Sequence, residues 1–523
     1  MQRERTGKIQ AAGRSAGGYR ASSRAVWASM LAGLTNRQLP IASATSLVSR
    51  DAFMSVSTAI HAGDGAPAAL LERLASILPR SALLVGDAID PRYQEDRRGR
   101  YSARPRFIAR PGTTEEVAAC LAACNDFAQP LVVQGGRTGL SGGHRIADGE
   151  AVLSTERMSL LGAVLPLTRM VLASAGTPLQ AVQEAAEAAG CQFGVDIGAR
   201  GSATVGGNVA TNAGGMRVLR YGMFRAQVAG LETVLADGTV LSALRGLDKD
   251  NAGYDLNQLF IGSEGTLGVV TKALLRLHPK PLDEANAFVA VPSVGAALAL
   301  LKRLRGAVGP GLSAFEIMLP QAYEGVTGFL GMPRPLAAQA PFYVLAEVQS
   351  FHDDQAIERF SASLMEGLEE GVAEDAVVSQ SPREFQSLWT MRDSCADYVR
   401  TRDHIIGGDV SVPLHRIEAF LGASQAAVRR IDPETEFLVF GHLGDGNLHY
   451  VIATPKARDA METVYRMVAE SGGSIAAEHG IGIDKKPWLH LSRSAAEIGT
   501  MRRLKAALDP KGILNRGRIF DGA

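Results

Sequence analysis

From residue 107 to about residue 280, short apolar runs alternate with segments whose apolar residues recur at helical spacing. The runs predict strands at 130–134, 151–154, 170–173, 228–235 and 268–272. Segment 177–189 places its apolar residues on one face, which predicts an amphipathic helix. Thr113 and Glu116 have the spacing of a capping box, so we expect another helix to begin there.

The texture of the sequence changes after Pro279 and Pro281, and this proline pair predicts a domain boundary. Beyond it, residues 283–470 combine apolar runs with long amphipathic segments, as expected of a unit with both strands and helices. A last helix is predicted over 492–507. The pattern therefore predicts an α+β protein with units at 60–280 and 283–470 and a closing segment at 471–523.

Composition removes several classes of function. Lysine plus arginine equals aspartate plus glutamate, 54 each, so the charge balance favours neither a nucleic acid nor an anionic membrane as partner. No run of eighteen apolar residues occurs, so no transmembrane segment is expected. Four cysteines are too few for a disulfide framework. Two of them, Cys120 and Cys124, lie four apart in a helical pattern and could share a metal. No further cysteine or histidine lies nearby in the sequence, so we expect them to pack in a core.

The first fifty residues differ from the rest, with eight basic residues against a single glutamate and many serines and alanines. Such a composition is that of an organelle transit peptide or of a disordered extension, and residues 1–55 are expected to be one of the two. The favoured interpretation is the extension, or an upstream start with the working chain beginning near Met54. The expected location is the bacterial cytoplasm, or the mitochondrion if the segment is a transit peptide.

Three glycine-rich segments occur at 134–143, 198–215 and 262–268. The first directly follows a predicted strand, the second lies between the predicted helix 177–189 and the strand 228–235, and the third precedes a predicted strand. Consecutive glycines let backbone N–H groups converge on an anion such as a pyrophosphate, and serine and threonine hydroxyls add donors. None of the three has the Gly-x-Gly-x-x-Gly spacing at a strand–helix junction, which disfavours a Rossmann site. Together they indicate a long dinucleotide lying across the first unit.

Two short strings hold three of the ten histidines. His442 and His449 flank a Gly-Asp-Gly turn, and a hairpin there would bring both imidazoles to one side. Glu478 and His479 follow about thirty residues later. Two neutral imidazoles and a carboxylate leave open positions on Zn²⁺, Mn²⁺ or Fe²⁺. The alternative from the residues alone is a pair of turn histidines and an exposed Glu-His pair.

The strings 130–143, 206–215 and 261–270 resemble the FAD-binding sequences of the vanillyl-alcohol-oxidase superfamily, in particular the branch of D-lactate dehydrogenase, D-2-hydroxyglutarate dehydrogenase and the glycolate oxidase flavin subunit. The resemblance covers nearly everything after about residue 70. It implies a PCMH-type FAD-binding domain, an α+β cap domain of the FAD-linked oxidase C-terminal type, and a closing segment that returns to the first. Arg137 stands where covalent members carry histidine, so noncovalent FAD is expected. The implied FAD contacts are Gly135, Gly136, Arg137, Thr138, Gly139, Gly201, Ser202, Gly206, Asn208, Thr211, Gly262, Glu264 and Gly265.

The same resemblance assigns roles in the second cluster. It implies that His442, His449 and Glu478 are metal ligands, with zinc expected and manganese or iron as alternatives. It further implies that His479 is the catalytic base, that Asn447 lies near the substrate, and that Arg392 clamps the substrate carboxylate. A guanidinium fork suits that bidentate contact.

One departure from the family pattern bears on the substrate. The 2-hydroxyglutarate enzymes carry a lysine for the distal carboxylate shortly before an Asp-x-Ser-x-Pro string, and Gly407 stands at that place here. Their second threonine contact is Ala396 here. We therefore expect a monocarboxylic D-2-hydroxy acid such as D-lactate, with D-2-hydroxyglutarate and glycolate as the alternatives.

The implied protein is an FAD-dependent dehydrogenase in which a metal chelates the substrate, His479 takes the hydroxyl proton and a hydride passes to the flavin. It needs an electron acceptor, which is a quinone, a cytochrome or an electron-transfer flavoprotein. A homodimer is an open possibility for its assembly. Two rivals are a non-redox transferase on the same FAD fold and a noncatalytic flavin subunit. Neither requires a hydroxy-acid chelator, so His442, His449, Glu478 and His479 together argue against both.

Overall fold

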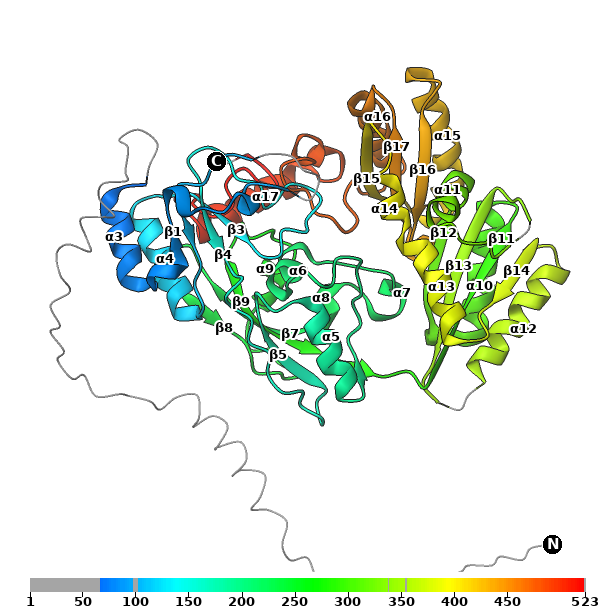
Figure 1. The fold of residues 1–523 in the computed structure, drawn as a ribbon, viewed down its shortest axis with the longest axis horizontal. Coiled ribbons are helices and arrows are strands. Elements are labelled where there is room, and N and C mark those ends of the chain that lie inside the picture. Colours follow the sequence, from blue (N-terminus) through cyan, green and yellow to red (C-terminus); the bar gives the residue numbers. More distant parts are fainter. Residues whose placement is uncertain (1–65, 97–101, 337, 353–354, 522–523) are drawn as a thin grey trace, which may run out of the picture. The chain divides into compact units, whose positions relative to one another are not determined.

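The N-terminal half of the described chain is built on two four-stranded sheets, with strand orders β1-β2-β4-β3 and β5-β9-β7-β8 (Figure 1). The computed structural model describes residues 66–96, 102–336, 338–352 and 355–521, so the predicted extension at 1–55 lies outside them. All five strands expected here from the apolar runs are present. The strands of this half are β1 (Leu83–Leu84), β2 (Ile108–Ala109), β3 (Leu131–Gln134), β4 (Ala151–Ser154), β5 (Met170–Ser174), β6 (Cys191–Gln192), β7 (Val228–Val234), β8 (Val240–Ser242), β9 (Val269–Arg276) and β10 (His278–Pro279).

Helix α4 begins at the one cap predicted in this half. Thr113 accepts a hydrogen bond from the backbone of Glu116 at the start of α4, as the spacing predicts. The Glu116 carboxylate reaches back to the N–H of Gly112, one residue before the expected partner. The helices are α3 (Ala68–Ile77), α4 (Thr114–Asp126), α5 (Leu179–Ala188), α6 (Val205–Thr211), α7 (Val218–Tyr221), α8 (Phe224–Gln227) and α9 (Asn257–Phe260).

Helix α6 is a difference from the sequence-based expectation, which treated 198–215 as a loop throughout. A Cβ at Gly206 would lie 2.7 Å from the Cβ of Ala175, so glycine at this position lets α6 pack against the end of β5. The helix ends at Asn212, whose φ of 49° is left-handed. Glycine therefore serves here to let a helix pack closely, as well as to form turns.

The C-terminal half contains one seven-stranded antiparallel sheet of order β14-β11-β13-β12-β16-β17-β15. Nine-residue strands β11 and β13 form its longest ladder. Of the candidate-site histidines, His442 directly follows β16 and His449 lies on β17. The strands are β11 (Asp283–Val291), β12 (Leu312–Met318), β13 (Phe342–Ser350), β14 (Asp375–Val378), β15 (Ile405–Ser411), β16 (Glu436–Gly441) and β17 (Asn447–Ala453).

Helices cover both faces of this sheet, because alternate strand residues point to opposite sides. One face packs against α10 (Val294–Val308), α12 (Ala356–Glu369), α15 (Ile417–Ile431) and α16 (Ala457–Glu470). The other face packs against α11 (Pro320–Leu330), α13 (Pro382–Asp393) and α14 (Cys395–Val399). The second face carries the candidate site, and α13 supplies Arg392 to it.

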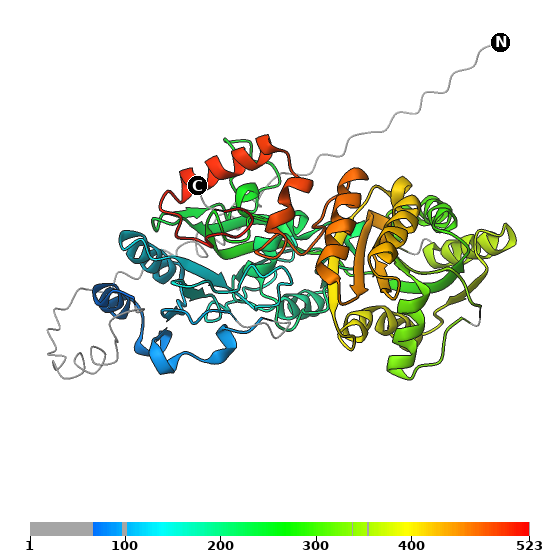
Figure 2. The same ribbon diagram turned by 90° about the horizontal axis from the view of Figure 1, so that it is seen from above.

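The chain ends by returning to the first sheet. After α17 (Ala495–Leu508), the Asp509 carboxylate accepts hydrogen bonds from the N–H groups of Ile513 and Leu514. Leu514 then pairs in parallel with Leu131 at the start of β3. Figure 2 shows this last segment, in red, beside the strands of the N-terminal half. The tail therefore braces the strand from which the first glycine-rich segment emerges.

The four cysteines are all buried and free. Cys120 and Cys124 lie in the core around α4, as expected, and burial raises the pKa of the Cys120 thiol to about 12. In the part of the chain that the structure describes, helices long and apolar enough to cross a bilayer are absent.

Candidate active site

The first glycine-rich segment packs tightly against the second. A Cβ at Gly135 would lie 2.4 Å from the Thr204 hydroxyl oxygen, and one at Gly136 would lie 1.9 Å from the Ser202 carbonyl oxygen. Arg137 follows with a left-handed φ of 56°, and its guanidinium stacks on the ring of Tyr93. The paired glycines are thus required by contact between two loops, whatever else they contact.

The second segment carries buried polar atoms that suit a polar ligand. Among the described residues, the Thr204 hydroxyl and the Asn208 side-chain nitrogen are buried without a hydrogen-bond partner. Buried polar groups normally have partners, so these two atoms fit a bound group rich in oxygen, such as a dinucleotide. Thr211 instead donates to the carbonyl of Gly207 within α6, and Gly201 and Ser202 are exposed at the turn before the helix.

The third segment uses its acidic residue in an unexpected way. Glu264 has a left-handed φ of 52°, between Gly262 and Gly265, which also have positive φ. Its carboxylate accepts hydrogen bonds from the N–H groups of Ile481 (2.7 Å) and Gly482 (2.8 Å). Burial raises the pKa of this carboxyl. The Glu264 side chain therefore holds the loop that follows His479, and its expected contact with FAD stays a prediction.

The histidine cluster is assembled by strand register. Asp409 pairs with His449, His449 pairs with Phe440, and Met318 pairs with Phe440, which puts these residues in one row across β15, β17, β16 and β12. The next row, on the same face, brings Glu316 beside His442. The short 3₁₀ turn Leu443–Asp445 joins β16 to β17 and ends at Gly446 in the left-handed region. As expected, the hairpin brings both imidazoles together, with ring centroids 5.2 Å apart.

Glu316 is the buried anion of the second row. Its Oε1 contacts Nδ1 of His442 at 2.6 Å and its Oε2 accepts from Nε of Arg392 at 2.6 Å. Burial alone would raise the pKa of Glu316, but Arg392 and His442 lower it to about 2. Burial alone would lower the pKa of His442, but Glu316 and Glu478 raise it to about 9. Glu316 therefore stays ionised, and its two oxygens hold the Arg392 guanidinium and the His442 ring in place.

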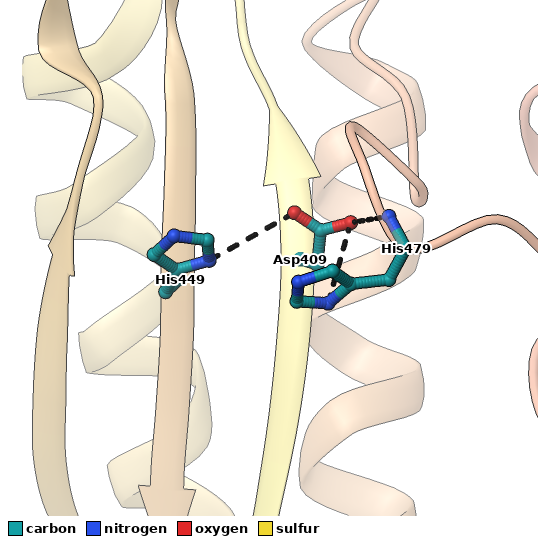
Figure 3. Close-up of side chains that lie close together, drawn as sticks. All are labelled: Asp409, His449 and His479. Atoms are coloured by element: carbon teal, nitrogen blue, oxygen red, sulfur yellow. Dashed lines mark hydrogen bonds and ion pairs between the residues drawn. The ribbon is translucent and has the colours of Figure 1, made fainter. Parts of the chain in front are cut away.

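Asp409 plays the corresponding part in the first row, between His449 and His479 (Figure 3). Its Oδ2 accepts from the N–H groups of Glu478 (2.9 Å) and His479 (2.8 Å), and its Oδ1 accepts from the Asn447 amide at 3.0 Å. Burial would raise the pKa of Asp409, but His479, Lys485 and His449 lower it well below its usual value. Asp409 thus anchors the segment that carries a candidate ligand and the candidate base.

Glu478 links this cluster to the glycine-rich segments. Its Oε1 accepts from the N–H of Gly215 at 2.8 Å, and its Oε2 lies 3.8 Å from Nε2 of His442. A Cβ at Gly214 would lie only 2.2 Å from the Glu478 carboxylate. One oxygen is therefore tied to the second segment while the other faces the imidazole.

Two overlapping groups in this cluster have the donors of a metal site. Ligand atoms of His442, His449 and Glu478 lie within 4.8 Å of one another, and so do those of Asp409, His449 and His479. Asp409 already accepts three hydrogen bonds, two from backbone N–H groups. The first group is therefore better suited to a divalent ion such as zinc.

The remaining predicted residues lie around this group. Arg392 is 5% exposed, and its guanidinium stacks on Phe440, next to His449. The His449 and His479 rings stack with centroids 5.7 Å apart. Asn447 donates to Asp409 and to the Val410 carbonyl, while its own carbonyl oxygen is buried without a partner among the described residues. The structure thus brings every predicted catalytic and metal residue to one face of the sheet.

Three buried charged residues of the site were missed by the sequence analysis. Asp409 begins the Asp-x-Ser-x-Pro string, which the sequence analysis used only to interpret Gly407, two residues earlier. Lys485, whose amine donates to the carbonyls of Asp409 and Ile475, follows the Glu-His string by six residues. Glu316 lies inside an apolar strand, and a lone acidic residue between hydrophobic neighbours on a fully buried strand was its only signal.

Comparison with known proteins agrees with this architecture. Residues 105–243 match the family described as FAD binding domain, and residues 280–519 match the family described as FAD linked oxidases, C-terminal domain. Among solved structures, p-cresol methylhydroxylase superimposes with a TM-score of 0.68 at 15% identity, covering 87% of this chain and 96% of that one. This likeness shows the fold alone: a PCMH-type FAD-binding domain with an FAD-linked oxidase C-terminal domain.

Curated relatives narrow the class. The chain is 40% identical to mitochondrial D-2-hydroxyglutarate dehydrogenase of Bos taurus, over 78% of this chain and 76% of the relative. It is 40% identical to D-2-hydroxyglutarate dehydrogenase of Xanthomonas citri, over 82% and 92% respectively. A putative mitochondrial D-lactate dehydrogenase of Schizosaccharomyces pombe is 34% identical over 79% and 82%.

The fold and site define an FAD-dependent oxidoreductase. Within that class, the chain belongs to the FAD-linked oxidase family that contains the D-2-hydroxyglutarate and D-lactate dehydrogenases. The predicted fold, the predicted family and the assignment to FAD-dependent oxidoreductases are therefore confirmed.

Proposed function

We propose that this protein oxidises a D-2-hydroxy acid to the 2-oxo acid, with a divalent metal held by His442, His449 and Glu478. The observation that carries the proposal is the series of neighbouring side chains Arg392, Phe440, His449 and His479, with the His442 ring beside that of His449. A cation for a carboxylate, a donor set for a chelating metal and an imidazole base are the groups that a 2-hydroxy acid requires.

Each residue has a definite task in this mechanism. Arg392 binds the carboxylate through its two terminal nitrogens, because its Nε is held by Glu316. His479 takes the hydroxyl proton while the Cα hydrogen leaves with its electron pair. When bound, FAD would supply the acceptor for that hydride, and the metal would supply a Lewis acid that lowers the pKa of the hydroxyl. The buried Asn447 carbonyl oxygen is free to accept a hydrogen bond from the substrate side.

A monocarboxylic substrate is the favoured choice within this function. Gly407 is two residues before Asp409 on β15 and pairs with Val451, so the face beyond His449 presents glycine and valine. Burying a second carboxylate without a cation costs several kcal/mol. Arg402 lies further along the same face but is engaged by Glu436 and stacked on Tyr398. D-lactate or a larger apolar 2-hydroxy acid fits these residues better than a dicarboxylate.

D-2-hydroxyglutarate is the second candidate, because the relatives at 40% identity carry that name. Its distal carboxylate needs a cation, and position 407 is glycine where the 2-hydroxyglutarate enzymes carry lysine. For this substrate to bind, Arg402 would have to leave Glu436 and contact that carboxylate. A dye-reduction assay on the purified yellow protein with D-lactate, D-2-hydroxybutyrate and D-2-hydroxyglutarate decides between them. We expect kcat/KM to favour the monocarboxylates, and the L-isomers to be inactive. A preference for the glutarate compound would transfer the proposal to the second candidate.

We further propose that FAD is held without a covalent bond, since Arg137 stands where covalent members carry histidine. Acid precipitation should release all the yellow colour into the supernatant, and a coloured pellet would contradict this. The reduced flavin requires an external electron acceptor, for which a quinone, a cytochrome and an electron-transfer flavoprotein are the candidates. Bacterial and mitochondrial relatives are both known, so the bacterial cytoplasm and the mitochondrion are the two candidate locations.

A further inference from the structure

Glu316 is completely buried on β12, yet it contacts two residues with different proposed tasks. Arg392 comes from α13, and His442 comes from the end of β16. Both contacts measure 2.6 Å, and each uses a different oxygen of the one carboxylate. A single rigid group therefore fixes the distance between the proposed carboxylate clamp and a proposed metal ligand.

These contacts leave the terminal nitrogens of Arg392 and the Nε2 atom of His442 available for substrate and metal. Among the described residues, Nε is the only nitrogen of Arg392 with a hydrogen-bond partner, so its two terminal nitrogens remain for a bidentate contact. His442 gives Nδ1 to Glu316, and its Nε2 lies 3.8 Å from a Glu478 oxygen. A carboxylate on one ring nitrogen fixes the tautomer that presents the other to a metal.

We propose that Glu316 is a positioning residue that couples the carboxylate clamp to the metal site and thereby selects 2-hydroxy acids. The proposal rests on the proposed function. In a 2-hydroxy acid the carboxylate and hydroxyl are on adjacent carbons, so both groups are reached only if Arg392 and His442 keep one separation. A 3-hydroxy acid places its hydroxyl one carbon further and does not fit a pair fixed in this way.

Glu347 offers a matched control, since it is an equally buried carboxylate on the neighbouring strand β13. It also pairs with an arginine, Arg217, and accepts hydrogen bonds from Trp389 and Ser313. None of these partners is a proposed ligand, clamp or base. A purely structural buried ion pair and a positioning residue can thus be compared in the same sheet.

The test compares Glu316→Gln with Glu347→Gln. Glutamine keeps the volume of Glu316 but turns one acceptor into a donor, which opposes either Arg392 Nε–H or His442 Nδ1–H. We expect the metal dissociation constant of Glu316→Gln, measured for Zn²⁺ by competition with a chromophoric chelator, to rise ten- to a hundredfold. FAD content should stay at the wild-type level. Glu347→Gln should lower the melting temperature and leave the metal dissociation constant within twofold.

Kinetics give the second measurement. In Glu316→Gln, KM for the 2-hydroxy acid should rise and kcat should fall, and the preference for the 2-hydroxy over the 3-hydroxy isomer should shrink. Glu316→Asp, which keeps the charge, should recover part of the metal affinity and serves if the glutamine variant does not fold. Wild-type metal affinity in Glu316→Gln, or an equal loss in Glu347→Gln, would overturn the proposal. Wild-type protein that binds Zn²⁺ but reduces no dye with any 2-hydroxy acid would contradict the proposed function instead, while the metal measurement still decides the role of Glu316.

Discussion

The glycine-rich segments and the sheet face that carries the histidines are the two halves of the candidate site, and they are built by different means. The segments fit together through backbone, as the absent Cβ atoms of Gly135 and Gly136 illustrate. The sheet face is made of ionisable side chains placed by register, with the buried carboxylates Glu316 and Asp409 holding their neighbours. In the glycine-rich half, the loops are positioned by glycines that allow close backbone contact. In the other half, the side chains are positioned by buried charges.

Each half of the site contributes one carboxylate that accepts hydrogen bonds from backbone N–H groups of the other half. Glu478, from the sheet side, accepts from the N–H of Gly215 in the second glycine-rich segment. Glu264, from the third segment, accepts from the N–H groups of Ile481 and Gly482 on the sheet side. Glu478 lies far from the glycine-rich segments in the sequence, yet it is in direct contact with the second of them. We therefore expect FAD to stay bound when the metal is removed. We also expect a change in the glycine-rich segments to shift the metal ligands.

The largest effect should come from removing the metal. Chelator treatment is expected to lower dye reduction about a thousandfold, because a Lewis acid supplies several kcal/mol to the reaction. The flavin spectrum should persist, since the buried polar atoms that suit FAD, on Thr204 and Asn208, lie in the other half. Adding Zn²⁺ back should restore turnover. Full activity in protein shown by elemental analysis to lack metal would contradict the chelation mechanism.

Coupling between the halves can be tested at Gly214. A Cβ there would lie 2.2 Å from the Glu478 carboxylate, so Gly214→Ala should displace a metal ligand and weaken Zn²⁺ binding ten- to a hundredfold. Gly198→Ala, in the same segment with open space around it, is the control and should bind Zn²⁺ normally. Chelator competition measures both. Equal affinities would mean that the second segment adapts without moving Glu478.

The two halves also differ in how far the sequence predicts them. All five strands predicted in the N-terminal half of the chain are found, because apolar runs and caps are local signals. Helix α6 was missed, since glycines in series predict a turn unless a close contact such as that with Ala175 is known. His442 and His449 were identifiable because a tight turn separates them. Glu316 was not, because its partners Arg392 and His442 come from distant segments that only the sheet register brings together.

A smaller effect is expected inside the glycine-rich half. Gly136→Ala would place a Cβ 1.9 Å from the Ser202 carbonyl oxygen, and such overpacking costs about 1–3 kcal/mol of folding stability. Gly139→Ala meets only the His144 ring at 3.6 Å, an ordinary contact, and is the matched control. Thermal unfolding and FAD content measure the difference. If both variants lose FAD equally, phosphate contacts rather than loop packing explain the glycines.

The smallest expected effect concerns two of the four buried thiols, Cys120 in the N-terminal half of the chain and Cys395 in the C-terminal half. Burial raises the pKa of the Cys120 thiol, within α4, and of the Cys395 thiol, at the start of α14, to about 12. Because the thiolate is the reactive form, it is present at pH 8 at about one part in ten thousand, and reactivity increases only as pH approaches 12. Iodoacetamide should therefore label neither residue in the native holoenzyme at pH 8, whereas denatured protein should be labelled at both. Mass spectrometry of the peptides reads the two halves separately. Rapid native labelling of Cys395 alone would mean that the sheet side opens in solution, and that its charged row is less rigid than its buried carboxylates imply.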